Sequence, residues 1–217
     1  MFDAKSLLDQ LVGSGAAGGF AGGLAGGAVA NVLSGKKGRK MAGSALKLGG
    51  LALVGGLAYK AWKNHQQGAG QPQPQSPGAV ELPPTGSAFL PREDDGAGTA
   101  ALSLLLARAM IAAAKADGQI DTQESQTILN QINGLDLPAD DKAFLFEEYG
   151  RPLDIAGLAR DVDSPEHAAE VYTAAVLMVE PPSPPERIFL NTLANALGLE
   201  TGLVQQIQAT VAANRPG

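Results

Sequence analysis

Four acidic side chains at two helix corners are the residues in this sequence best suited to chemistry. Asp117, Asp121 and Glu124 surround the first corner, in the run KADGQIDTQE, and Glu180 precedes the second. Carboxylate oxygens are the ligands that Ca²⁺ and Mg²⁺ prefer, although this spacing is not the twelve-residue EF-hand loop. A helix-closing Gly118 and a capping box of Asp121 with Glu124 explain the same corner without a ligand. The corner therefore predicts either a helix cap or a divalent-cation site.

Helices must position these corners, because apolar residues recur at the helical period from residue 99 to the end of the chain and no strand pattern occurs there. We expect an all-α bundle. Proline at a helix start and glycine after a helix end mark its boundaries. The expected helices cover residues 100–116, 122–133, 139–149, 152–160, 165–179, 187–197 and 200–213.

An internal sequence repeat, called the echo below, links the two corners. Residues 112–129 and 174–190 share one plan: an apolar helix ending in an acid, a short break, a cap, a glutamate three positions on, and a second helix. Ser183 and Glu186 form the capping box of the second copy. This echo favours pseudo-twofold packing of two helical hairpins around one core. Arg108 or Arg187 could neutralise paired acids at the corners just as a metal could.

Charge divides the chain into a basic front and an acidic back. The 217 residues have a net charge of −6, yet residues 1–67 contain eight Lys/Arg against two Asp. From residue 99 onward, 16 acids outnumber seven bases, which disfavours nucleic-acid binding. The absence of cysteine excludes disulfides, thiolate catalysis and Cys-based zinc sites. No cleavable secretory signal is evident at the start.

The front of the chain has the pattern of a glycine-zipper hairpin. A short amphipathic helix over residues 2–12 precedes 22 uncharged residues, 12–33, in which small residues fall four apart. Such rows let two helix backbones approach closely, as they do in lipid. A basic turn, KKGRK, leads to a second apolar stretch over residues 41–62, which ends in Tyr59 and Trp62, residue types of the membrane interface. The small-residue rows are Gly15, Gly19, Gly23 and Gly27, and Gly18, Gly22, Gly26 and Ala30.

Three interpretations of this front remain open: a membrane-associated hairpin through residues 12–62, a soluble self-associating hairpin, or low-complexity sequence. Glycine's weak helix propensity and the charge of Lys47 count against the first. If the hairpin spans a bilayer, its basic turn should face the cytoplasm. Lys60 and Lys63 weaken that orientation, and a shallow hairpin with everything cytoplasmic is the alternative.

Three units are expected in the whole chain. Residues 1–67 would form the membrane-associating hairpin, residues 68–98 a Pro/Gly-rich linker, and residues 99–213 the helical domain. A G-x-G-x-x-G match at residues 13–18 does not indicate a dinucleotide site, because no strand precedes it. His65 lies in the flank of the front, His167 is expected on a solvated helix face, and no G-x-S-x-G context assembles a hydrolase triad.

Three motifs carry a family resemblance. They are the AAKADGQID-x-x-E pattern, the run EVYTAAV, and the run E-x-x-x-L-x-x-LANALGL that begins at Glu186. Over residues 99–213 they resemble a TerB-like domain, and with the Gly-rich front the layout resembles the DUF533 (YebE-like) family. The resemblance implies an all-helical, internally duplicated domain linked to envelope or tellurite stress. It also implies metal binding through the acidic corners, and no established enzymatic activity.

Together these patterns predict a non-enzymatic, membrane-anchored interaction or stress-response module at the bacterial inner membrane. The front would self-associate through the glycine zipper, and the acidic domain would bind an unidentified protein partner. The alternative is a soluble or peripheral protein that sequesters or senses a divalent cation. Its metal ligands would be Asp117, Asp121, Glu124 and Glu180.

Overall fold

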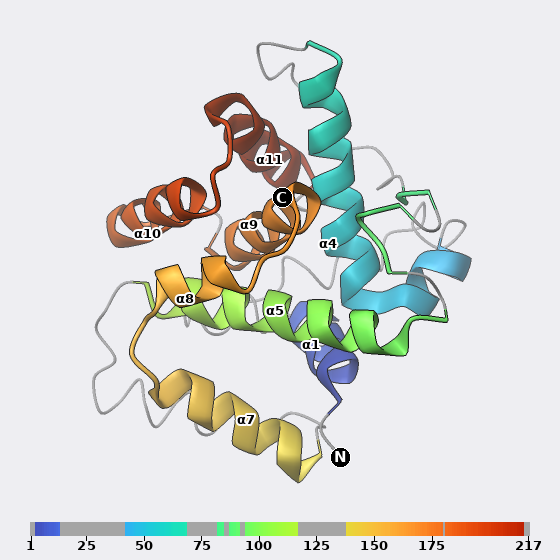
Figure 1. The fold of residues 1–217 in the computed structure, drawn as a ribbon, viewed down its shortest axis with the longest axis vertical. Coiled ribbons are helices and arrows are strands. Elements are labelled where there is room, and N and C mark those ends of the chain that lie inside the picture. The colour runs from blue at the N-terminus through green and yellow to red at the C-terminus, as the bar shows by residue number, and fades with distance from the viewer. Residues whose placement is uncertain are drawn as a thin grey trace.

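The structure is a computed structural model that describes residues 3–13, 42–68, 82–84, 87–91, 94–116, 138–179 and 181–214. These residues form eight helices and no strand, which confirms the expected all-α fold (Figure 1). The glycine-zipper rows, from Gly15 to Ala30, lie outside the described residues. The helices are α1 (Ala4–Gly13), α4 (Ala42–Gln66), α5 (Gly96–Ala114), α7 (Ala139–Gly150), α8 (Ile155–Arg160), α9 (Pro165–Val179), α10 (Pro184–Ala196) and α11 (Thr201–Ala213).

The centre of the bundle is the pair α5 and α9, the first helices of the two expected hairpins. Both are apolar around most of their circumference, as helices buried on several sides are. The Asp95 side chain caps α5 by accepting the N–H of Gly98 at 2.8 Å. Of the described helices, α5 alone is long and apolar enough to cross a bilayer, and half of that window is buried inside the bundle.

The helix boundaries in the C-terminal part follow the predicted caps. The carboxylate of Glu186 accepts the backbone N–H of Ser183 at 2.6 Å, which is the glutamate half of the predicted capping box, and α10 begins at Pro184. Gly198 has a φ of 66°, and α10 ends just before it. Ser164 Oγ accepts the N–H of His167 at 3.1 Å at the start of α9. The local cap predictions for α9 and α10 are therefore confirmed.

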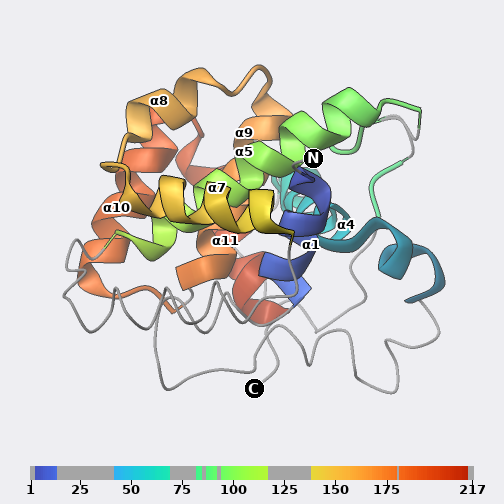
Figure 2. The same cartoon turned by 90° about the horizontal axis from the view of Figure 1, so that it is seen from below.

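The described front of the chain lies in the same core as the C-terminal helices. Helix α1 packs on α5, and α4 packs on α1, α9 and α11 (Figures 1 and 2). Buried apolar side chains of α4 join those of α9 and α11 in one cluster. The division into residues 1–67, 68–98 and 99–213 stays a prediction, and the contacts of α1 with α5 and of α4 with α9 and α11 join elements on either side of it. The buried α4 side chains are Leu51, Ala52, Val54, Leu57, Ala58 and Ala61.

Helix α7 lies on the far side of α5 from α9, α10 and α11 (Figure 1). Its fully buried Asp141 accepts the backbone N–H of Asp3 at 2.9 Å, which fastens α7 to the start of α1. The Asp3 side chain in turn accepts the N–H groups of Lys5 and Ser6, each at 3.1 Å. The beginning of the chain is thereby joined to a helix more than a hundred positions later.

Candidate functional site

The acidic corners predicted from the sequence are not among the residues that the structure describes. Asp117, Asp121, Glu124 and Glu180 all lie outside them, so the divalent-cation site stays a prediction. Within the described ranges, no group of three or more His, Asp or Glu side chains is arranged to hold a metal ion.

The two arginines considered as counter-charges have other partners. Arg108 pairs with Glu148 at 3.2 Å and with Asp161 at 2.7 Å. Arg187 donates from Nη1 to the carbonyl oxygen of Pro182 at 3.0 Å. Burial alone would lower the pKa of Arg108, but its two carboxylate partners outweigh burial and raise the pKa above its ordinary value.

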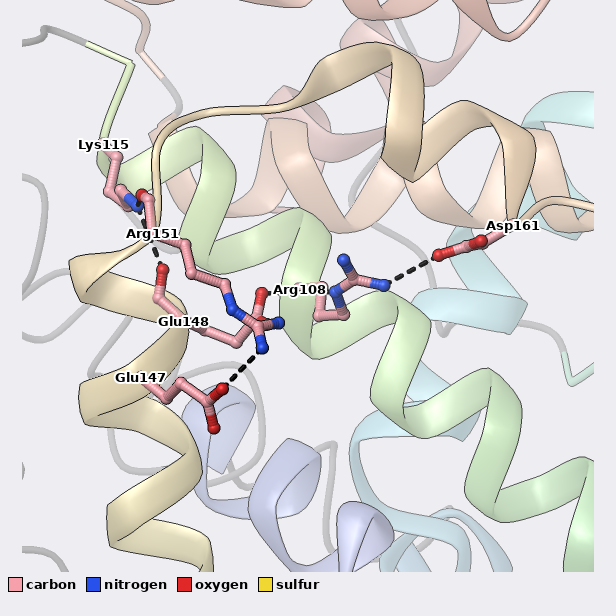
Figure 3. Close-up of polar contacts among 6 residues, drawn as sticks. All are labelled: Arg108, Lys115, Glu147, Glu148, Arg151 and Asp161. Carbon is pink, nitrogen blue, oxygen red and sulfur yellow. Dashed lines mark hydrogen bonds and ion pairs between the residues drawn. The ribbon is translucent and has the colours of Figure 1, made fainter.

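An ion-pair network joins α5, α7 and the end of α8 (Figure 3). Glu148 of α7 is its centre, because it pairs with Arg108 of α5 and, at 2.5 Å, with Arg151. Arg151 also pairs with the exposed Glu147 at 2.5 Å. The Glu148 side chain is only 10% exposed, so these partners compensate the loss of its hydration. The network joins α7 to α5 beside the apolar contacts that Leu145 of α7 makes in the core.

Lys115 closes the C-terminal end of α7. Its Nζ donates to the carbonyl oxygen of Glu148 at 3.0 Å and to that of Arg151, and it lies 5.8 Å from the centroid of the Tyr149 ring. A cation at this end complements the helix dipole and the carbonyls that lack helical partners. Burial lowers the pKa of Lys115, and the opposing effect of Glu148 is smaller.

Replacing Lys115 by methionine should release the end of α7. Methionine keeps an unbranched stem but removes two donated hydrogen bonds, so we expect a loss of about 1 kcal/mol in unfolding free energy. Amide exchange in residues 138–150 should accelerate relative to α9. The control is Arg160→Met, because that side chain is 78% exposed and its contact with Asp154 is long, at 3.9 Å. Unchanged exchange in α7 would contradict the capping role.

A cavity of about 380 Å³ lies beside this network, between α5, α7 and α8. Ile111, Ala112 and Leu158 form its apolar side, while Arg108, Lys115 and Glu148 contribute charge. Every one of those charged groups already has a partner within the protein. We therefore interpret this cavity as part of the packing between α5, α7 and α8 and not as a binding site.

A second group of contacts, distinct from the ion-pair network, surrounds α4. We call the surface of α9, α11 and residues 87–91 that α4 covers the α4-binding face. Phe89 packs edge-on against Tyr59 and Trp62 of α4, with ring centroids 5.6 and 5.7 Å apart. At the end of α4, His65 pairs with Glu200 at 3.0 Å. A cavity of about 560 Å³ lies beside this end, lined by Trp62 and His65 among others.

Asp9 of α1 caps the buried part of α4. Gly49, with a φ of 60° and a ψ of −138°, interrupts α4, and the Asp9 carboxylate accepts the N–H of Gly50 at 2.7 Å. A Cβ on Gly49 would overlap the Asp9 carboxylate, so glycine is required there for both conformation and space. A side chain from another helix thus supplies the N-cap of residues 50–66.

Removal of this cap should destabilise the docked α4. We expect Asp9→Ala to lower the unfolding free energy by about 1 kcal/mol, the usual cost of losing an N-cap. Urea unfolding measures this loss of unfolding free energy. Asp9 also forms a half-exposed pair with Lys5 at 2.6 Å. The control is therefore Lys5→Ala, which removes only that pair and should cost at most about 0.5 kcal/mol. Equal losses in the two variants would assign the effect to the ion pair.

Glu170 lies at the centre of the α4-binding face. It is 0% exposed, and within the part of the chain that the structure describes neither carboxyl oxygen has a hydrogen-bond partner. A Cβ on Gly55 of α4 would lie 3.0 Å from Glu170 Oε1 and 2.9 Å from the carbonyl oxygen of Phe89, so the three groups meet closely. Burial raises the pKa of Glu170 well above its ordinary value, and the nearby Glu166 raises it further.

The sequence analysis did not single out Glu170 or Asp9. Glu170 stands inside the run AAEVYTAAV, where every neighbouring position is buried in α9. A lone carboxylate within a helix that is apolar on all sides is the signal that could have identified it. His167, expected on a solvated face, pairs with Asp163 at 2.5 Å, and this hydrogen bond lowers the pKa of Asp163.

A comparison with family models finds a match over residues 18–211, to the family described as "Protein of unknown function (DUF533)". No curated protein and no solved structure matches the chain. The matched range includes the described helices from α4 to α10 and all but the last two residues of α11, while α1 lies before it.

Proposed function

Since the chain belongs to the DUF533 family of proteins of unknown function, we propose a function from its own helix packing: a membrane-anchored, non-enzymatic interaction module that binds an apolar helix. The observation that carries the proposal is the position of α4. This apolar helix from the front of the chain packs along α9 and α11. Asp9 caps it, and Phe89 packs against its aromatic side chains. Binding of an amphipathic helix to an apolar face is a common mode of peptide recognition.

The proposed membrane anchor is the segment that precedes α4. Residues 12–33 are uncharged and rich in small residues, and a basic turn connects them to α4. A helix of this composition suits a close helix–helix contact in lipid. In the proposed cycle, α4 either covers its binding face or joins the preceding segment at the membrane, where Tyr59 and Trp62 suit the interface. The α4-binding face is then free for a helix of a partner protein.

Two measurements on the full chain test the proposal. After carbonate washing of cell membranes, the chain should remain in the membrane fraction, and its recovery in the soluble fraction would exclude anchoring. A photo-crosslinking residue at Leu203, which is buried beside Trp62, should capture α4 in detergent-free solution and a partner in membranes. The control is the same group at Ile188, 69% exposed on α10. Identical products at both positions would contradict a specific face.

A further inference from the structure

We propose that Glu170 makes the docking of α4 releasable: its buried, unpartnered carboxyl group favours the docked helix when protonated and expels it when ionised. This inference rests on the proposed function, because it names what controls access to the α4-binding face. The geometry that carries it is an interface in which a carboxyl group meets a backbone carbonyl and a glycine, and no residue that the structure describes donates a hydrogen bond to the carboxyl oxygens.

The surroundings of Glu170 offer no counter-charge among the residues that the structure describes. On its own helix, Glu166 lies one turn earlier and is the charged neighbour that acts on it, with the same sign. The described buried side chains of α4 are all apolar, and those of α5 and α11 include Ser103, Gln206 and Thr210 but no charge. On the fourth side, residues 87–91 present the Phe89 carbonyl oxygen and the Leu90 side chain. An ionised carboxylate here lacks both pairing and hydration.

The protonated form fits the site better. A neutral carboxylic acid has one O–H donor, and the Phe89 carbonyl oxygen is an acceptor lying against the same point of α4. Once α4 departs, water reaches the carboxyl group and its ionisation is no longer penalised. The docked and undocked states therefore differ in proton affinity, which couples the position of α4 to pH.

The direction of this coupling follows from the raised pKa of Glu170 in the docked state. Docking is fully favoured below the ordinary glutamate value of 4.5, and that contribution is lost as pH rises from there through the raised pKa. Acidification therefore holds α4 on the bundle, and a rise in pH promotes its release. Near neutral pH, replacing Glu170 by glutamine should remove the drive for release while keeping the side-chain volume.

The absence of cysteine permits a direct test on the full chain. Ala61→Cys places a thiol on the buried side of α4, and Ala194→Cys places one on α10, where it reports opening of the rest of the bundle. Maleimide labelling is then compared between each thiol variant with and without Glu170→Gln, at the same pH. This comparison cancels the pH dependence of the thiol itself.

At pH 7.5 we expect labelling at position 61 to be faster with Glu170 than in the Glu170→Gln variant, by about tenfold for each unit by which docking raises the pKa of Glu170. Near pH 4.5 the two rates should converge, and position 194 should not respond. Glu147→Gln, which removes an equal charge from a 63% exposed side chain, should leave position 61 unchanged. If Glu170→Gln does not fold, Glu170→Met serves, since an apolar side chain also cannot ionise.

Equal rates at position 61 in the presence and absence of Glu170 would overturn the inference. So would a matching acceleration at position 194, because the whole bundle would then be opening. Flotation with anionic phospholipid vesicles distinguishes this result from failure of the proposed function. Release of α4 without vesicle binding would leave the switch intact and contradict the membrane role.

Discussion

Replacing Leu57 by alanine should lower the free energy of unfolding by about 2–5 kcal/mol, the usual cost of a large-to-small change in a packed core. Leu57 is 2% exposed and lies on the buried side of α4. Because α4 shares its core with α9 and α11, the loss should appear in the whole bundle. The single tryptophan, Trp62, is on α4, so its fluorescence reports the front while far-UV circular dichroism reports all helices.

The informative outcome is whether Trp62 fluorescence and circular dichroism report the same unfolding midpoint. In urea near pH 4.5, where α4 should be docked, the Trp62 fluorescence and the circular dichroism should share one midpoint, and Leu57→Ala should shift both together. Leu53→Ala is the matched control, because Leu53 is a partly buried neighbour of the core and should cost less. If Trp62 changes at lower urea while the helical signal keeps its midpoint, residues 1–67 form a separate unit, as the sequence division has it.

The bundle helices could be predicted because their signals are local. The serine and proline before α9, the capping box of Ser183 with Glu186, and Gly198 after α10 each act within a few residues, and the structure confirms all three. The expected helix over residues 139–149 corresponds to α7, Ala139–Gly150, for the same reason. Helix type and ends follow from such caps without knowledge of the neighbouring helices.

The position of α4 could not be predicted, because hydrophobicity does not identify what covers an apolar helix. A stretch such as residues 41–62 has the same composition whether lipid or protein surrounds it. The contacts that dock α4 are long-range: Asp9 caps Gly50 from 41 positions away, and His65 meets Glu200 across 135. The isolation of Glu170 among apolar residues is visible in the sequence, but its contact with Gly55 near the Phe89 carbonyl oxygen depends on the position of α4.

Gly55 is a position of α4 that should tolerate a side chain poorly, although its backbone conformation is an ordinary one. We expect Gly55→Leu to lower the unfolding free energy by about 1–3 kcal/mol, the usual cost of overpacking, and to change the fluorescence of Trp62. The added Cβ would lie 2.9 Å from the Phe89 carbonyl oxygen, which is backbone and yields only if residues 87–91 move. Leucine is the better test than alanine, because alanine's higher helix propensity, about 1 kcal/mol, would mask part of the clash.

The control for Gly55→Leu is Gly150→Leu, at the end of α7, where an added Cβ meets no atom within 4 Å. A surface change of that kind should alter stability by at most about 0.5 kcal/mol. A Gly55→Leu protein with unchanged stability and unchanged Trp62 fluorescence would contradict the packing of α4 against Phe89. A double variant, Gly55→Leu with Glu170→Ala, distinguishes the contact with the Glu170 carboxyl group from the contact with the Phe89 carbonyl oxygen. The shorter side chain relieves only the carboxyl contact, so most of the loss should persist if the Phe89 backbone decides the fit.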